Sequence, residues 1–127
     1  AAIHSKRHAV DRLQAIIGVF RSYVDNPPIK GGCPLLNTAI ESDDAHPALR
    51  ERAQQAMNSW RKLFYRIIQK GIEKGEIRST VDADEVTTIL IATLEGAMMM
   101  SKLYGNSIHI ERAINHLTNY IESQLRI

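Results

Sequence analysis

The most uniformly apolar stretch of the chain lies between Val86 and Met100, where Glu95 is the single charged residue. A helix on the surface of a globular protein keeps one polar face, so a helix that is apolar nearly all round predicts burial on more than one side. The stretch falls short of a membrane span, which needs about 20 consecutive apolar residues, because it is shorter and contains threonines as well as Glu95. In so small a chain, covering this helix calls for a second copy of the protein or a large ligand.

Strong signals mark both ends of this predicted helix. Asp82 at the N-cap and Glu85 three residues later form a capping box, in which each side chain can accept a hydrogen bond from the other residue's free amide. Val81 and Val86 occupy the two positions of a hydrophobic staple. Gly105 supplies the stop at the other end.

Apolar residues recur three and four positions apart elsewhere in the chain, which indicates further helices. Pro27 ends the first helix, because proline disfavours helical backbone at the residue before it, and Gly75 ends the long third one. No period-two pattern of strands occurs, so the predicted fold is all-α, an approximately antiparallel bundle of five helices. The predicted helices cover about residues 7–25, 35–41, 48–74, 82–104 and 108–127.

Length and composition are those of an ordinary globular domain. The 127 residues, 44% of them hydrophobic and 24% charged, suit a single domain, residues 1–127, with one core. The formal net charge of +2 arises from interleaved basic and acidic residues, which argues against dedicated nucleic-acid binding. The single cysteine, Cys33, excludes an internal disulfide and fits a reducing compartment. No signal peptide is visible, and a start at Ala1 without an initiator methionine is compatible with upstream sequence.

The candidate chemical residues do not assemble into a catalytic or metal site. His4 and His8 are one helical turn apart, but no carboxylate or thiol is placed to complete a metal site, so solvated side chains are favoured. His109 and His116 lie two turns apart, where interface or surface roles are favoured over ligation. Cys33 has no recognisable base. We therefore predict no catalytic residues, no metal and no cofactor.

A basic row with i, i+4 spacing runs along the long third helix. The acidic residues Glu73 and Glu76 lie nearby, so a solvated face is favoured over an anion or nucleic-acid patch. The row consists of Lys62, Arg66, Lys70 and Lys74.

Three features of the apolar helix bear on what covers it. Glu95 must be paired, protonated or near solvent, and structural pairing is favoured over anchoring a ligand. Methionines 98–100 suit adaptable core packing, and also a surface that accommodates varied apolar partners. Ala92 and Gly96, four apart on one face, would let another helix come close.

Several short motifs occur together in a familiar order. They are the segments GGCPLLNTAIE at 31–41, PALR at 47–50, GEIR at 75–78, DAD at 82–84 and LEGA at 94–97. Each is unspecific alone, but in this order and spacing they cover most of the chain. The sequence resembles the tetracycline-repressor (TetR) family of transcriptional regulators.

This resemblance implies the ligand-binding and dimerisation domain at the C-terminal end of such a regulator. The family's helix-turn-helix, which reads DNA, has no match here, because residues 1–25 look like the helices that follow it. Pro34 departs from the family's pattern, which more usually has another apolar residue at this position of the motif. The resemblance therefore predicts the sensor domain of a bacterial repressor that acts in the cytoplasm. It would reach operator DNA only through an N-terminal domain absent from this chain, and no membrane partner is expected.

Large side chains converge on one stripe of the third helix, with a polar group opposite, which is the usual make-up of a small-molecule site. We predict a pocket for a small apolar or amphipathic effector among the helices. Its predicted lining residues are Leu36, Ile40, Met57, Trp60, Phe64 and Thr93.

The excess of apolar surface on the 82–104 helix predicts a two-fold homodimer. We expect the C-terminal half of that helix and the last helix to pack against their mates as a four-helix bundle. A charge at Leu117 should then give monomers or insoluble protein, whereas a charge at Asn119 should do little. The predicted interface residues are Met98, Met99, Leu103, Ile114, Leu117 and Ile121. Part of the stripe on the last helix must hold that helix onto its own subunit, so the sequence leaves open which of its residues cross the interface.

Two other functions compete with a sensor domain. A helical protein-interaction module without a small-molecule site would show a closed, fully packed core. An all-α enzyme is disfavoured, because no pair of nucleophile and base is evident in the sequence.

Overall fold

A computed structural model describes residues 8–25 and 47–127, and these residues are all-helical apart from turns and one isolated bridge between Ile77 and Arg126. The predicted all-α class is confirmed, and four of the predicted helices are present within a few residues of their expected ends. The predicted short helix at 35–41 lies outside the described residues. The elements are α1 (Ala9–Asp25), α3 (Pro47–Glu73), α4 (Ala83–Tyr104), α5 (Ile108–Tyr120) and a π-helical turn, η1 (Ile121–Leu125).

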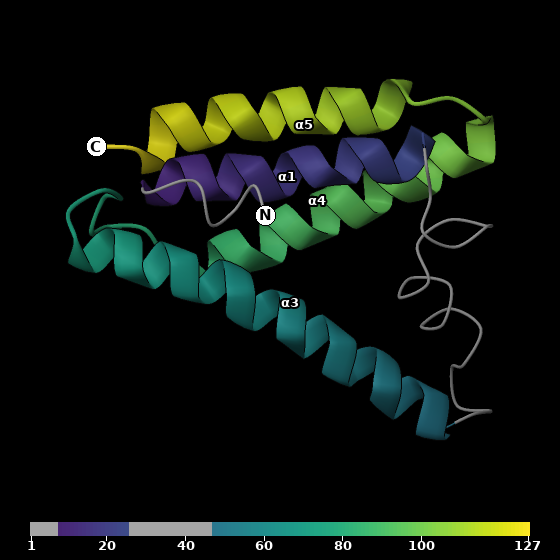
Figure 1. Cartoon of the computed structure of the whole chain (residues 1–127), viewed down its shortest axis with the longest axis horizontal. Helices are drawn as coiled ribbons and strands as arrows, with labels where there is room; N and C mark the ends of the chain where they lie inside the picture. Colours follow the sequence, from purple (N-terminus) through teal and green to yellow (C-terminus); the bar gives the residue numbers. More distant parts are fainter. Residues whose placement is uncertain (1–7, 26–46) are drawn as a thin grey trace.

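Helices α1, α4 and α5 form a closely packed group, and α3 lies across α4 and α1 (Figure 1). The α4 and α5 helices run antiparallel and share the most extensive contact in the fold. The N-terminal half of α3 diverges from the other helices, whereas its C-terminal half packs against them (Figure 1). The core therefore sits where α1, α4 and α5 meet the second half of α3.

The buried core takes one apolar stripe from each helix, as the spacing of three and four predicts. Close packing of these stripes in place of water is the main stabilising contribution. Side chains with no more than 1% of their surface exposed include Leu13, Ile17, Phe64, Ile68, Leu90, Leu94, Ile110, Leu117 and Ile121.

The ends of α4 are capped as its sequence predicts. The Asp82 side chain accepts a hydrogen bond from the Glu85 amide at 3.1 Å, which satisfies one of the free amides of the first turn. Gly105 follows the last turn with φ at 72°, a left-handed conformation that glycine adopts without the clash of a Cβ atom, and its amide donates to the carbonyl of Ser101.

In the turn from α4 to α5, the first amides of α5 donate to side chains other than that of its N-cap residue. The buried Ser101 hydroxyl accepts a hydrogen bond from the Ile110 amide at 3.0 Å, and Asn106 Oδ1 accepts one from the Ile108 amide at 3.0 Å. Ser107, at the N-cap of α5, makes no side-chain cap bond. Ser101 thus joins the last turn of α4 to the first turn of α5.

At the opposite end of the molecule, the start of α1 is held by two other segments. The Ala9 amide donates to Glu76 Oε1 at 3.1 Å, from the turn after α3. Arg126, beyond η1, donates to Asp11 at 2.6 Å and to Glu122 at 2.7 Å. Hydrogen bonds from Arg126, and a further one from Gln14, lower the pKa of Glu122. These contacts fasten the C-terminus and the α3–α4 turn to α1.

By length and composition alone, α4 is also a candidate to cross a membrane. Its packing against α3, α1 and α5 is that of a core helix, which meets the same test. Eight of its residues, from Ala83 to Ser101, are buried inside the chain.

Candidate functional site

An aromatic cluster occupies the middle of α3. The Trp60 ring lies 5.6 Å from the ring of Phe20 and 6.2 Å from that of Phe64, distances at which aromatic rings attract each other. Phe64 is fully buried, whereas Trp60 keeps part of its surface exposed. The cluster therefore places one partly accessible aromatic side chain on a rigid base contributed by α1 and α3.

Three of the predicted pocket residues belong to this region of α3. Met57 and Trp60 are half-buried, and Phe64 lies beneath Trp60 in the core. Thr93 on α4 is also half-buried. Leu36 and Ile40 lie outside the described residues, so the pocket as a whole stays a prediction. Phe20 of α1 also belongs to the cluster, although the predicted pocket did not include it. Its position in the apolar stripe of the first helix could have indicated that it is buried against the other helices.

Two polar side chains of α4 extend into its apolar surroundings. Thr87 is fully buried, and its hydroxyl has no hydrogen-bond partner among the described residues. Glu95 is half-buried, with Oε2 out of contact with solvent. Buried polar atoms are unfavourable inside a protein unless they are satisfied, so both positions are sensitive to what lies next to them.

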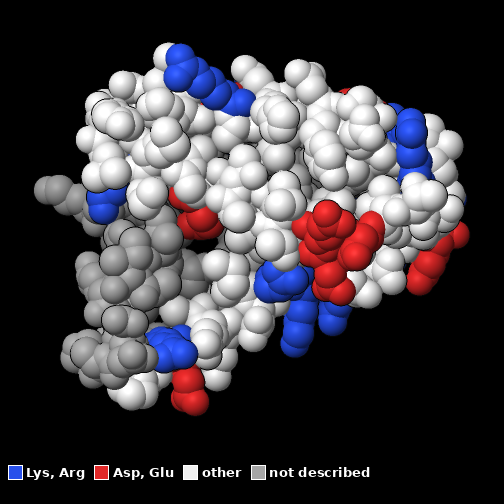
Figure 2. All heavy atoms as spheres, turned by 180° about the vertical axis from the view of Figure 1, so that it is seen from behind, with Lys and Arg blue, Asp and Glu red and all other residues white. Residues whose placement is uncertain are grey.

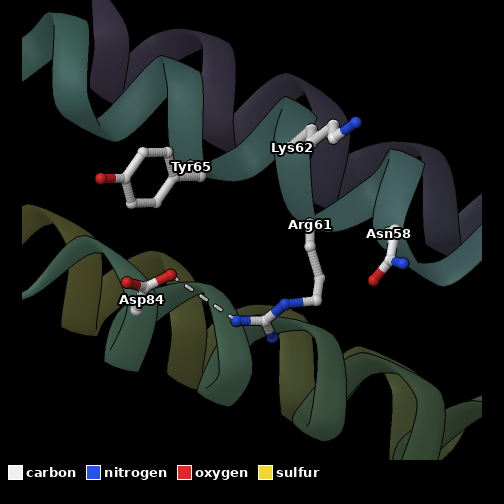
Figure 3. Close-up of a pocket in the computed structure, with 5 residues that line it drawn as sticks. All are labelled: Asn58, Arg61, Lys62, Tyr65 and Asp84. Atoms are coloured by element: carbon white, nitrogen blue, oxygen red, sulfur yellow. Dashed lines mark ion pairs between the residues drawn. The ribbon is translucent and has the colours of Figure 1, made fainter.

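A polar groove of about 280 Å³ opens between α3 and the first turns of α4 (Figure 3). Arg61 reaches across it from α3, with a guanidinium nitrogen 3.8 Å from the Asp84 carboxylate, and it donates a hydrogen bond to the Thr88 hydroxyl at 2.9 Å. The groove is lined by Asn58, Arg61, Lys62, Tyr65 and Asp84.

This groove is distinct from the predicted pocket, since it shares no residue with it. Asp84 is largely exposed, and an exposed ion pair contributes only about 0–1 kcal/mol. The ion pair across the groove therefore adds little to the packing of α4 on α3. The predicted basic row did not indicate this contact, because Arg61, which spans the groove, lies just outside the row.

Several large apolar side chains are exposed in a stripe along α4. Its positions alternate four and three apart, so they lie on one face of the helix. At its two ends Ile89 has 48% of its surface exposed and Leu103 has 74%, and small residues occupy its centre. No described atom comes within 4 Å of a Cβ atom built on Gly96. We define the α4 face as Glu85, Ile89, Ala92, Gly96, Met99 and Leu103, flanked by Met100.

The structure corrects four of the six predicted interface residues. Met98 is 7% exposed and Ile114 is 5% exposed, and both belong to the core of this chain. Leu117 and Ile121 are buried still more completely. These side chains hold α4 and α5 onto their own subunit, so they are not available to a partner. A charge at Leu117 should accordingly unfold the chain instead of releasing folded monomers.

Of the predicted interface residues, Met99 and Leu103 lie on the exposed α4 face. The outer side of α5, by contrast, is polar: its exposed residues include Arg112, Asn115 and Asn119. The outer side of α5 is therefore unsuited to an apolar contact with a second copy along its whole length.

The basic row of α3 is solvent-exposed along its whole length. Over the face seen in Figure 2, lysine and arginine side chains are mixed with aspartate and glutamate, and broad uncharged areas lie between them. This mixture agrees with a solvated helix face and gives no continuous basic surface on the side shown.

The histidines are spread over the described part of the chain. His8 Nδ1 accepts a hydrogen bond from the Val10 amide at 3.1 Å and so caps the start of α1. The His109 ring lies 5.2 Å from that of Tyr104. Within residues 8–25 and 47–127, no group of three or more histidine, cysteine or acidic side chains is arranged to hold a metal ion.

Comparison with known proteins decides the family. A family model described as the tetracyclin repressor-like C-terminal domain matches residues 9–117, most of the chain. The chain belongs to the tetracycline-repressor family. It corresponds to the C-terminal domain of these transcriptional regulators, as the sequence motifs indicate.

Two solved structures of TetR-family regulators have the same fold. One, from Chloroflexus aurantiacus J-10-fl, is 47% identical over 96% of this chain, with a TM-score of 0.93. The other, from Cytophaga hutchinsonii, is 32% identical over 98% of this chain, with a TM-score of 0.83. The chain spans 62% of the length of either protein. None of the curated proteins matches it.

Proposed function

We propose that this chain is the effector-sensing and dimerisation domain of a bacterial TetR-type repressor. The observation that carries the proposal is the match of the family's C-terminal domain to residues 9–117. In this proposal operator DNA is bound by a helix-turn-helix that precedes these residues in the whole regulator. The regulator would act in the cytoplasm, where its DNA is.

The effector is a small apolar or amphipathic molecule that binds beside Trp60. The half-buried indole, supported by Phe20 and Phe64, offers an apolar contact surface, and the half-buried Thr93 on α4 is the candidate polar group for orientation. Sites of this composition, with few polar groups among aromatic side chains, are typical for small molecules. The effector acts by binding one spacing of the two DNA-reading domains more tightly than the other, which shifts their populations.

The partner across the α4 face is a second copy of the chain. The stripe is symmetric in size about its centre: Ala92 and Gly96 flank the midpoint, and Ile89 and Met99 lie equally far from it. An antiparallel α4 helix related by a two-fold axis therefore sets the small residues against each other and Ile89 against Met99, with Glu85 opposite Leu103 at the ends.

Charge agrees with this arrangement. Glu85 and Lys102 lie near opposite ends of α4, and both are exposed. The two-fold axis brings Glu85 towards Lys102 of the partner subunit, which favours a second copy over an unrelated apolar partner.

The effector site can be tested through Trp60, the only tryptophan of the chain. Compounds that release the full-length regulator from operator DNA should change Trp60 emission in the full-length protein, and a Trp60→Phe variant should show no such signal while retaining release. Effectors that control DNA binding but leave Trp60 emission unchanged in every case would place the site elsewhere. If no compound binds to the regulator at all, a helical protein-interaction module without a small-molecule site would be favoured.

A further inference from the structure

One side of α5 runs along the edge of the α4 face. Its residues His109, Ala113, His116 and Tyr120 are spaced four, three and four apart, so they share one side of the helix. At one end His109 lies against Tyr104 of α4, with ring centroids 5.2 Å apart. At the other end Tyr120 is partly buried; burial raises the pKa of Tyr120, and the charge of Glu85 on α4 raises it further.

The four residues remain open to the outside. His116 is exposed, and the other three are only partly buried. The ring contact of His109 with Tyr104 and the packing of α5 on α4 place this side of α5 next to α4. The uncharged surface that a second copy would cover therefore continues from α4 onto α5.

His116 lies beside the narrowest part of that surface. The hydrogen bond between Ser101 and Ile110 sets the register of the two antiparallel helices. Six residues further along α5 correspond to six residues back along α4, because both rise by about 1.5 Å per residue. His116 is thus level with the turn from Ala92 to Gly96, where small side chains let a partner helix come closest.

We propose that self-association through the α4 face is controlled by protonation of His116, and that the neutral imidazole favours the dimer. The inference rests on the proposed dimer and adds its regulation. Covering His116 with apolar side chains removes water from it, and this penalises the charged form. Each dimer contains two such histidines, so the effect acts twice.

The charged groups nearby do not offset the penalty. Arg112, which is itself positively charged, lies one turn before His116 on α5. On α4 at this level, Glu95 lies on the side of the helix away from α5. Glu85 and Lys102 lie towards the two ends of the α4 face, and His109 and Tyr120 lie towards the two ends of this side of α5.

The direction of the pH effect follows from linkage. Histidine in water changes charge near about pH 6.5. The dimer prefers the unprotonated form, so its stability is complete above that pH and falls as the pH drops below it, by up to about tenfold in affinity per pH unit for each histidine that must lose its proton.

The test is sedimentation velocity of this chain over a concentration series between pH 5.5 and 8.0, with circular dichroism at each pH to follow the fold. We expect the dimer dissociation constant to be at least about tenfold larger at pH 5.5 than at pH 7.5, with helicity unchanged. His116→Gln should abolish most of this dependence, and His116→Lys should weaken the dimer at every pH.

The outcomes separate the two proposals. A dimer whose dissociation constant is the same at pH 5.5 and 7.5, or whose pH dependence persists in His116→Gln, would overturn the role of His116 and leave the dimer in place. A folded monomer at every pH and concentration would overturn the dimer itself.

Discussion

The start of α1 passes close to Gly71 of α3. A Cβ atom at this position would lie 2.7 Å from the Cβ of Ala9 and 2.7 Å from Cδ1 of Ile77. The Ala9 methyl group is fixed by its backbone, which Glu76 also holds by a hydrogen bond. The absence of a side chain at Gly71 is therefore a condition for the packing of α1 on α3.

Gly71→Ala should destabilise the chain. Overpacking costs about 1–3 kcal/mol, which outweighs the gain of up to about 1 kcal/mol from replacing glycine by alanine in a helix. The control is Gly18→Ala in α1, where no described atom lies within 4 Å of the added Cβ, and it should leave stability unchanged or raise it. Urea unfolding followed by circular dichroism measures both, and equal effects of the two variants would contradict the account.

At the scale of elements, the pairing of α4 with α5 depends on how their connecting turn is satisfied. The first backbone amides of a helix have no acceptor within the helix. In α5 the amide of Ile110 is one of them, and it lies in a buried position. Ser101, from the preceding helix, supplies the acceptor that a residue at the N-cap usually provides. One hydroxyl thereby fixes both the end of α4 and the register of α5.

Ser101→Ala should lower the free energy of unfolding by about 1–3 kcal/mol, because it leaves the buried amide of Ile110 without its acceptor. Ser107→Ala is the matched control. Ser107 occupies the N-cap of α5 but makes no side-chain cap bond, so its loss should cost less than about 0.5 kcal/mol. Thermal and urea unfolding of both variants would show the difference, and a larger loss for Ser107→Ala would refute this assignment.

At the scale of the whole molecule, the described residues combine one buried core with an exposed α4 face. Leu103 keeps 74% of its surface exposed although it belongs to the most apolar helix of the sequence. Stable dimer interfaces bury on the order of 1,600 Å² or more in total, and among the described residues the α4 face together with the adjoining side of α5 offers apolar surface for the proposed dimer. The proposed effector site beside Trp60 and the proposed dimer surface would both involve α4, whose movement would couple them.

Gly96→Leu should separate folding from dimerisation. In the single chain no described atom lies within 4 Å of a Cβ at Gly96, so the variant should fold with unchanged or slightly higher helicity. In the dimer, the added side chain would keep the two α4 helices apart, and sedimentation should show a folded monomer. Gly18→Leu on α1 is the control, and it should remain dimeric. Unchanged dimerisation of Gly96→Leu would exclude this crossing point.

The sequence by itself determined the helices and their ends, because caps and three-four spacing act over a few neighbouring residues. Asp82 and Gly105 could be recognised as the ends of α4 before any packing was known. The family could be recognised too, since its motifs are local. The same local signals indicated that α4 carries more apolar surface than one subunit covers.

Only the tertiary structure decided which apolar stripe faces which neighbour. The spacing of Ile114 and Leu117 predicts a buried stripe, and it cannot distinguish burial in the subunit's own core from burial against a partner. The choice of Ser101 over Ser107 as the cap of α5 likewise depends on a contact between two helices. Periodicity along a chain fixes a face of a helix, whereas the element that covers this face is set by packing between segments distant in sequence.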